Sequence, residues 1–368
     1  MSDTGILIPG VYAPSMTIPG VYAPNMTIPG VFEVHPMRDA VLAYIASLAE
    51  TKVLLGQRFY SGDSDHTYFP IPVTSSYVME IDGLYALTGK YPALIGSGFE
   101  YGQTSAEVTA MLDYLIAYWN DGGLVTLDFF PGNPWTGGGC DDRTGLNLTA
   151  LITPGGSGNA AWMTYLSSIA DSLDILKAAG VVVIWRPFME VNSSGSWWAL
   201  LYLDTNYAEY VALWRHMHDY FTVTRGLDNL LWLYAPAAEP IGRQLTTGRS
   251  CYPGDGYVDL VGLSAYITET ILPRSEGDSY TPMLALGKPL IFSETGPTHY
   301  KLDGVTTQRD GTFDNRNIIN LIKNSYPKIA AFMSWNSTGG YKMSIRTDAN
   351  AQALVDDPMI ITRDEVDW

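Results

Sequence analysis

Short runs of apolar residues alternate along most of the chain with stretches whose apolar residues recur at helical spacing. There are eight of these apolar runs. Runs that do not alternate strictly with polar residues are typical of parallel strands, because such strands are buried on both faces. The predicted strands are Val53–Gln57, Ala93–Gly96, Leu124–Asp128, Val181–Trp185, Asn229–Tyr234, Val258–Leu263, Pro289–Phe292 and Ile329–Met333.

The stretches between these runs predict helices. One opens with Thr104-Ser-Ala-Glu107, the pattern of a capping box, and another closes at Gly180. Strands that alternate with helices favour a (β/α)8 TIM barrel, and no GxGxxG follows the first strand as a nucleotide-binding sheet requires. The predicted helices are Met37–Ala49, Thr104–Trp119, Asn159–Ala179, Tyr207–Phe221, Phe313–Tyr326 and Ala349–Val355.

The first 32 residues form a repeat of period ten, in which Ile-Pro-Gly-Val is followed by an aromatic residue. Proline and glycine at fixed positions exclude a helix and favour extended segments joined by turns. We therefore predict an N-terminal extended arm at 1–35 and a catalytic barrel at 36–368. The arm either packs on the barrel or on a neighbouring subunit of a homo-oligomer, or residues 1–32 attach the chain to a larger particle.

Composition narrows the classes of molecule that the chain can bind. Of 368 residues, 46% are hydrophobic and 16% are charged, which predicts a large buried core. A net charge of −17 argues against nucleic acid and against anionic membranes, and favours a neutral substrate. The 10 tryptophans and 24 tyrosines exceed what a core needs and indicate a surface for flat, partly apolar ligands such as sugar rings.

Other signals are sparse. Cys140 and Cys251 form either one disulfide or two separate thiols, and the sequence leaves both open. The five histidines show no metal-binding spacing, so we expect no metal and no cofactor. No apolar stretch reaches 18 residues, which predicts no membrane span. The N-terminus does not read as a signal peptide, so export by another route, a removed leader and no export all stay open.

Catalysis in a barrel belongs at the C-terminal ends of the strands, and two carboxylates there stand out. Glu190 follows the fourth strand among apolar and aromatic residues, where desolvation raises a carboxyl pKa as a general acid needs. Glu294 ends the seventh strand, on rigid backbone that suits a nucleophile. The plain structural readings are a pair between Glu190 and Arg186, and a helix cap at Glu294. A carboxylate separation of about 5–5.5 Å predicts a retaining glycosidase.

Several segments in order resemble glycoside hydrolase family 26, a family of retaining barrel enzymes in clan A. The resemblance spans roughly residues 50 to 340 and leaves the N-terminal repeats outside. It rests on the segments Val53–Gln57, Trp185–Trp198, Leu213–Pro236, Tyr252–Tyr266 and Ser293–Gly296.

The resemblance implies roles for individual residues. Glu190 is the expected acid/base and Glu294 the expected nucleophile. Arg186 is expected to hold the carboxylates electrostatically, Tyr266 to hydrogen-bond the nucleophile, and Trp335 to form the floor of the subsite at the cleavage point. Further expected substrate-binding residues are Trp197 and Trp198 as stacking faces, together with Asp128, Phe130, Trp135, Gln57 and Asn192.

Two departures from the family pattern bear on the substrate. Met189 stands where the family usually has a histidine before the acid/base residue, and Phe130 stands where it often has a histidine past the third strand. Both changes remove imidazole contacts near the cleaved sugar. The family's commonest substrate is β-1,4-mannan, and other members cut β-glucans or β-1,3-xylan.

We therefore predict a retaining endo-β-glycosidase that hydrolyses β-mannan or a related β-glycan through a covalent glycosyl-enzyme, with polysaccharide or oligosaccharide as its partner. One alternative keeps the chemistry in a phage- or particle-associated depolymerase of bacterial capsule or exopolysaccharide. Another is a non-catalytic carbohydrate-binding barrel. The expected location is extracellular or virion-associated.

Overall fold

The computed structural model describes residues 36–60, 71–193, 195–199, 207–238, 249–267, 279–300, 305–338 and 340–368. The predicted arm at 1–35 lies outside the described residues. Residues 35–368 form one compact unit, which contains all the elements named below.

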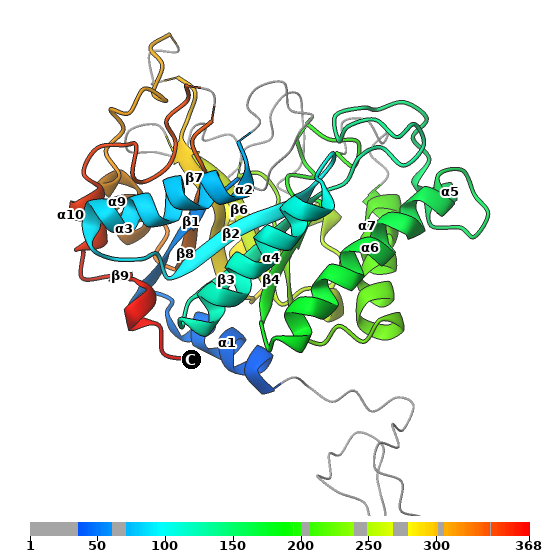
Figure 1. Cartoon of the computed structure of the whole chain (residues 1–368), viewed down its shortest axis with the longest axis horizontal. Helices are drawn as coiled ribbons and strands as arrows, with labels where there is room; N and C mark the ends of the chain where they lie inside the picture. Colours follow the sequence, from blue (N-terminus) through cyan, green and yellow to red (C-terminus); the bar gives the residue numbers. More distant parts are fainter. Residues whose placement is uncertain are drawn as a thin grey trace, which may run out of the picture. The chain divides into compact units, whose positions relative to one another are not determined.

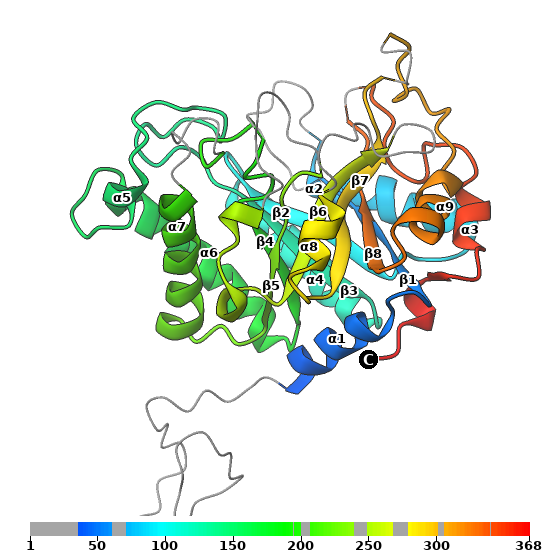
Figure 2. The same cartoon turned by 180° about the vertical axis from the view of Figure 1, so that it is seen from behind.

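Eight parallel strands close into a barrel, as predicted. Each strand pairs with the next along the chain, and β1 closes the ring by pairing with both β8 and β2. Figure 1 shows helices outside the strands, with α4 and α6 in front, and Figure 2, from the opposite side, shows α8 in front of the strands and α9 beside β8. The strands are β1 (Val53–Arg58), β2 (Leu94–Glu100), β3 (Leu124–Phe130), β4 (Val183–Pro187), β5 (Leu230–Tyr234), β6 (Leu260–Ile267), β7 (Leu290–Pro297) and β8 (Ile329–Ser334).

The longer helices confirm the sequence pattern. At the start of α4, the Thr104 side chain accepts from the Glu107 backbone N–H, and the Glu107 carboxylate accepts from the Thr104 backbone N–H, which confirms the capping box. The predicted last helix begins later than expected. The observed helices that correspond to the predicted ones are α1 (Pro36–Ser47), α4 (Ser105–Asn120), α6 (Asn159–Ala178), α7 (Tyr207–Asp219) with its π-helical extension η3 (Tyr220–Thr224), α9 (Arg316–Ser325) and α10 (Ala351–Val355).

Several short elements were not predicted from the sequence. A helical segment connects β1 to β2 along the chain and consists of α2 (Val73–Tyr77), the π-helical turn η1 (Val78–Asp82) and α3 (Gly83–Thr88). The helices α5 (Leu148–Leu151) and α8 (Tyr280–Leu284) are also new, as are short 3-10 turns near 249–257 and 363–365. The two-residue strand β9 (Ile360–Ile361) pairs with the start of β1.

The bottom of the barrel is tied to the first helix. The Arg38 guanidinium of α1 donates to the Leu230 carbonyl at the start of β5, at 2.8 Å, and to Asp259 just before β6, at 2.5 Å. These contacts keep α1 near the N-terminal ends of the strands, so the opposite ends stay open for chemistry.

Two further sequence questions are answered by the described residues. No disulfide joins Cys140 and Cys251. Within the described ranges, no helix combines the length and the hydropathy that a membrane crossing needs.

Candidate active site

A chain of buried charges crosses the top of the barrel. Asp128 on β3 accepts from the Arg186 Nε of β4 at 2.6 Å and from the Arg58 Nε of β1 at 3.1 Å. All three side chains are almost fully buried. Buried ions need partners of opposite charge, because desolvation costs several kcal/mol per ion. Asp128 therefore fixes two arginines at the strand ends, and its role as a sugar ligand stays a prediction.

Arg58 extends this network toward the other strands. Its Nη2 donates to Glu100 on β2 at 2.5 Å, and its Nη1 donates to Asn336 past β8 at 2.8 Å. Its guanidinium also lies 4.1 Å from the ring centroid of Trp335. One arginine therefore links the β1, β2, β3 and β8 strand ends and supports the underside of a tryptophan.

Glu294 on β7 has both carboxylate oxygens held. Arg186 donates through Nη1 and Nη2 to Oε2, each at 3.1 Å. The Tyr266 hydroxyl on β6 donates to Oε1 at 2.5 Å. The side chain is only 7% exposed. Three hydrogen bonds from Arg186 and Tyr266 hold the carboxylate in one orientation, which is what an attacking group requires.

Glu190 lies three residues past the end of β4, on strained backbone. Its φ is 54° and that of Phe188 is 48°, in the left-handed region that side chains with a Cβ rarely adopt. The Glu190 N–H donates to the Ala235 carbonyl past β5 at 2.8 Å, which holds the turn in place. Backbone strain of this kind is concentrated at functional sites.

The surroundings of Glu190 favour its protonated form. Burial and the negative charge of Glu294 together raise the pKa of Glu190 to about 7, while Arg186 and the Ser264 hydroxyl act in the opposite direction. The two carboxylates are therefore near enough to influence each other's titration. One acid that still carries its proton near neutral pH, beside a second that is held by an arginine and a tyrosine, can serve as a proton donor and a nucleophile.

Trp335 lies directly past β8, beside Glu294. Its backbone N–H donates to the Thr295 carbonyl at 2.9 Å, and its ring is half-buried over Arg58. The Arg186 guanidinium lies 5.8 Å from the same ring centroid. This position at the strand ends, with part of the ring open, suits the predicted subsite floor.

Four predicted substrate-binding residues are instead structural. Trp197 and Trp198 are fully buried, and their indole N–H groups donate to the Pro131 and Met189 carbonyls, each at 2.9 Å. The prediction that they stack on sugars is therefore wrong: they form the aromatic packing beneath the Glu190 loop, with Phe188.

Gln57 and Asn192 are also wrongly predicted as ligands. Gln57 is fully buried, donates to the Arg58 carbonyl at 2.8 Å and accepts from the Ile345 N–H at 3.0 Å. Asn192 makes a two-way amide pair with the Ala237 backbone, at 3.0 and 2.7 Å. Both side chains brace loops near the site and have no exposed surface for a sugar.

Phe130 and Trp135 remain predicted contacts. Each is half-buried on or beyond the end of β3. Phe130 packs near Trp198, with ring centroids 6.4 Å apart, and Trp135 packs edge-on to Trp197 at 5.6 Å. Met189, which replaces the family's histidine, is buried in the hydrophobic core.

Sequence reasoning missed Arg58 and Arg309. Arg58 is adjacent to the chosen Gln57, and side chains alternate between the two faces of a strand, so the choice was one residue early. Arg309 donates to the Pro297 carbonyl at 3.1 Å, and its guanidinium lies 5.2 Å from the ring centroid of Tyr266. No strand pattern marks Arg309, because it comes from the long connection after β7.

The chain is similar to proteins of known activity. The family model described as Glycosyl hydrolase family 26 matches residues 35–365. A protein named mannan endo-1,4-beta-mannosidase A and B, from Caldalkalibacillus mannanilyticus, is 35% identical over 77% of the chain, which spans about half (53%) of that relative's length. A mannan endo-1,4-beta-mannosidase from Bacillus subtilis is 31% identical over 88% of the chain and 85% of its own length. The solved structure of the Bacillus subtilis mannanase man26 superposes with a TM-score of 0.73 at 27% identity, covering 91% of the chain and 94% of the other protein.

Proposed function

The chain belongs to glycosyl hydrolase family 26 and is a glycoside hydrolase, and on this premise we propose that it is a retaining endo-β-1,4-mannanase. The substrate is proposed from the relatives, whose names describe mannan endo-1,4-beta-mannosidases. The catalytic roles are proposed from the contrast between two carboxylates: Glu190, with its pKa raised to about 7, and Glu294, held by Arg186 and Tyr266.

In the first step, a Glu294 oxygen attacks the anomeric carbon as the bond from that carbon to the glycosidic oxygen breaks. Glu190 gives its proton to the departing oxygen, and the sugar is left covalently bound to Glu294. In the second step, water attacks the same carbon, Glu190 takes the water proton, and the Glu294 carboxylate is released. Two inversions restore the original anomeric configuration, which requires a carboxylate separation of about 5–5.5 Å.

The neighbours of the two acids support these roles. Arg186 and the Tyr266 hydroxyl stabilise the negative charge of Glu294 before attack and after release. In the covalent intermediate Glu294 is an uncharged ester, so these hydrogen bonds are weaker. Once Glu294 is esterified, its negative charge no longer raises the pKa of Glu190. Glu190 then loses its proton more readily and becomes the base that the second step needs.

The relatives support neither of the two alternatives. The particle-associated depolymerase keeps the same chemistry and differs in substrate. A non-catalytic barrel has no use for an acid whose pKa lies near 7 beside a second carboxylate. We also propose action outside the cell, because a polysaccharide of many sugar units does not cross a membrane unaided.

A substrate panel tests the proposal. Purified protein is incubated with β-mannan, galactomannan, β-glucans, xylans and bacterial exopolysaccharides, and reducing ends and product lengths are followed. The proposal predicts rapid release of manno-oligosaccharides of mixed length from mannan. Cleavage of an exopolysaccharide with none of mannan would replace it with the depolymerase. Binding without any new reducing ends would replace it with the non-catalytic barrel.

A further inference from the structure

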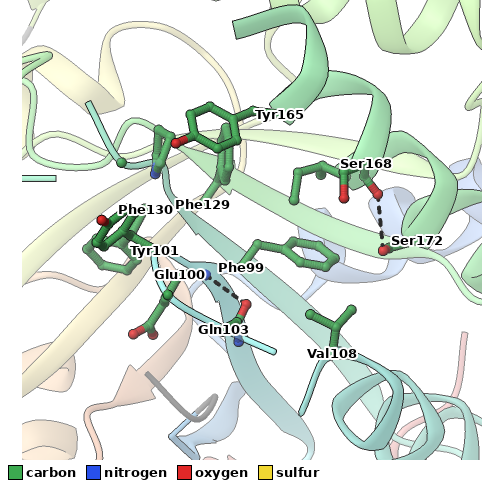
Figure 3. A pocket seen from close by; sticks show the side chains of 14 residues that line it. Phe99, Glu100, Tyr101, Gln103, Val108, Phe129, Phe130, Tyr165, Ser168 and Ser172 are labelled. Atoms are coloured by element: carbon green, nitrogen blue, oxygen red, sulfur yellow. Dashed lines mark hydrogen bonds between the residues drawn. The ribbon is translucent and has the colours of Figure 1, made fainter. Parts of the chain in front are cut away.

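A pocket of about 290 Å³ opens on the outer side of the barrel, between α4 and α6 (Figure 3). Its lining includes two rings from adjacent strands, Phe99 of β2 and Phe129 of β3. Val108 of α4 and Ile169 of α6 add apolar surface. The volume lies just below the range for small-molecule pockets, about 300 to 1,000 Å³, so it suits one ring rather than an oligomer.

Hydroxyl groups complete the lining. Tyr165, Ser168 and Ser172 of α6 line the pocket beside these apolar side chains. The Ser172 hydroxyl donates to the Ser168 carbonyl at 3.2 Å, which leaves its oxygen as an acceptor. Burial raises the pKa of Tyr165, so its hydroxyl keeps its proton at neutral pH and is a donor. Phe99 and Phe129 are 3% exposed and form the floor of the pocket, whereas the rings of Tyr101, Phe130 and Tyr165 are only half-buried. Half-buried aromatic rings beside hydroxyl donors and acceptors match the two surfaces of a pyranose ring.

The rim is held by hydrogen bonds before any ligand arrives. The Tyr101 hydroxyl donates to the Gly137 carbonyl at 2.6 Å. Gln103 uses both ends of its amide, accepting from the Glu100 N–H at 2.9 Å and donating to the Gly98 carbonyl at 3.0 Å. Gly132 is required beneath Tyr101, because a Cβ there would lie 2.3 Å from the ring. A pre-formed rim reduces the ordering cost of binding.

Charge also restricts the ligand. Glu100 lines the pocket but pairs through its carboxylate with Arg58, 2.5 Å away in the barrel mouth. The other lining side chains carry no charge at neutral pH, and the chain as a whole has a net charge of −17. The pocket therefore fits a neutral ligand. Glu100 and Phe130 border both this pocket and the strand ends that carry the catalytic residues, so the two sites are adjacent.

We propose that this pocket binds a single neutral hexopyranose unit of the polysaccharide while the chain lies in the active site. The unit is either a side branch or a backbone residue beyond the cleavage region. This inference rests on the proposed function for its source of sugar. The binding chemistry itself, a pyranose face on aromatic rings with hydroxyls toward Tyr165 and the two serines, is independent of catalysis.

The test fills the pocket. Ser168→Trp places an indole in it, and Thr164→Trp, on an exposed part of the same helix outside the pocket, is the matched control. Tyr165→Phe removes only a hydroxyl. Kinetics are compared on galactomannan, on unbranched mannan and on a chromogenic mannobioside. We expect Ser168→Trp to raise KM for polymer about fivefold with kcat unchanged, to leave the mannobioside unaffected, and Tyr165→Phe to give a smaller rise.

A rise in KM on galactomannan alone identifies a side branch, and a rise on both polymers identifies a backbone unit. Equal KM values for Ser168→Trp and Thr164→Trp on both polymers would overturn the proposal. A second measurement does not depend on hydrolysis: saturation-transfer NMR with methyl α-galactoside and methyl β-mannoside. Signal that persists in Thr164→Trp and falls in Ser168→Trp supports the pocket even if no mannan is cleaved; no difference between the two variants contradicts it.

Discussion

Replacing Tyr266 with phenylalanine removes one oxygen from the site and leaves the ring in place. The lost group is the hydroxyl that donates to Glu294 at 2.5 Å, while the two Arg186 bonds to the other carboxylate oxygen remain. A hydrogen bond to a charged group contributes about 1.5 to 3 kcal/mol. At about 1.4 kcal/mol per tenfold change in rate, we expect kcat/KM to fall about 10- to 150-fold.

The assay is steady-state hydrolysis of mannan and of an aryl mannobioside, with thermal unfolding measured on the same samples. Tyr118→Phe is the matched control, because its buried hydroxyl donates to the Pro92 carbonyl just before the start of β2, at the other end of the barrel. The control should lose stability with little loss of kcat/KM. A Tyr266→Phe enzyme within about threefold of wild type would show that this bond does not orient the nucleophile.

Three further predictions concern protons. Glu190→Ala should slow substrates with poor leaving groups far more than activated aryl glycosides, as measured by kcat/KM; equal losses on both would remove Glu190 from the acid role. Because the Glu190 pKa is raised to about 7, kcat/KM for mannan should fall above pH 7 as the acid loses its proton, and a profile flat from pH 6 to 9 would contradict this. Asp348 is buried with no hydrogen-bond partner for either oxygen, and burial with the charge of Asp310 raises its pKa to about 8. A raised pKa contributes stability that is full below the unfolded value near 4 and is lost as pH rises to about 8, so the Tm of Asp348→Asn should gain on wild type across this range; a Tm difference that does not change with pH would count against it.

The barrel could be predicted because its strands are buried on both faces and read as continuous apolar runs. Most of their C-terminal ends were placed too early, although that of β5 was correct. The structure extends β6 to Ile267 and β7 to Pro297, past the last predicted apolar residues. The added residues include Ser264, Tyr266 and Glu294, whose polar groups face the site. The apolar pattern that predicts a strand therefore stops before the strand does, because the last residues of the strand serve the site and not the core.

Part of the candidate site could be predicted because its residues lie at strand ends, and the prediction was wrong in two respects. Glu190, Glu294, Arg186 and Tyr266 are brought together as strand-end positions suggested. Arg58 was missed because a one-residue shift on a strand exchanges the two faces. Trp197 and Trp198 were misread because a sequence does not distinguish an indole that faces solvent from one whose N–H is satisfied by a buried carbonyl.

The proposed mechanism depends on a covalent bond between Glu294 and the anomeric carbon. The most direct measurement is trapping with a 2-deoxy-2-fluoro-β-mannobiosyl fluoride, followed by proteolysis and mass spectrometry of the labelled peptide. The account predicts stoichiometric inactivation with the fluorinated sugar on Glu294, and recovery of activity as the ester hydrolyses. A label on Glu190, or turnover of this reagent with no covalent adduct and with inversion at the anomeric carbon, would contradict it.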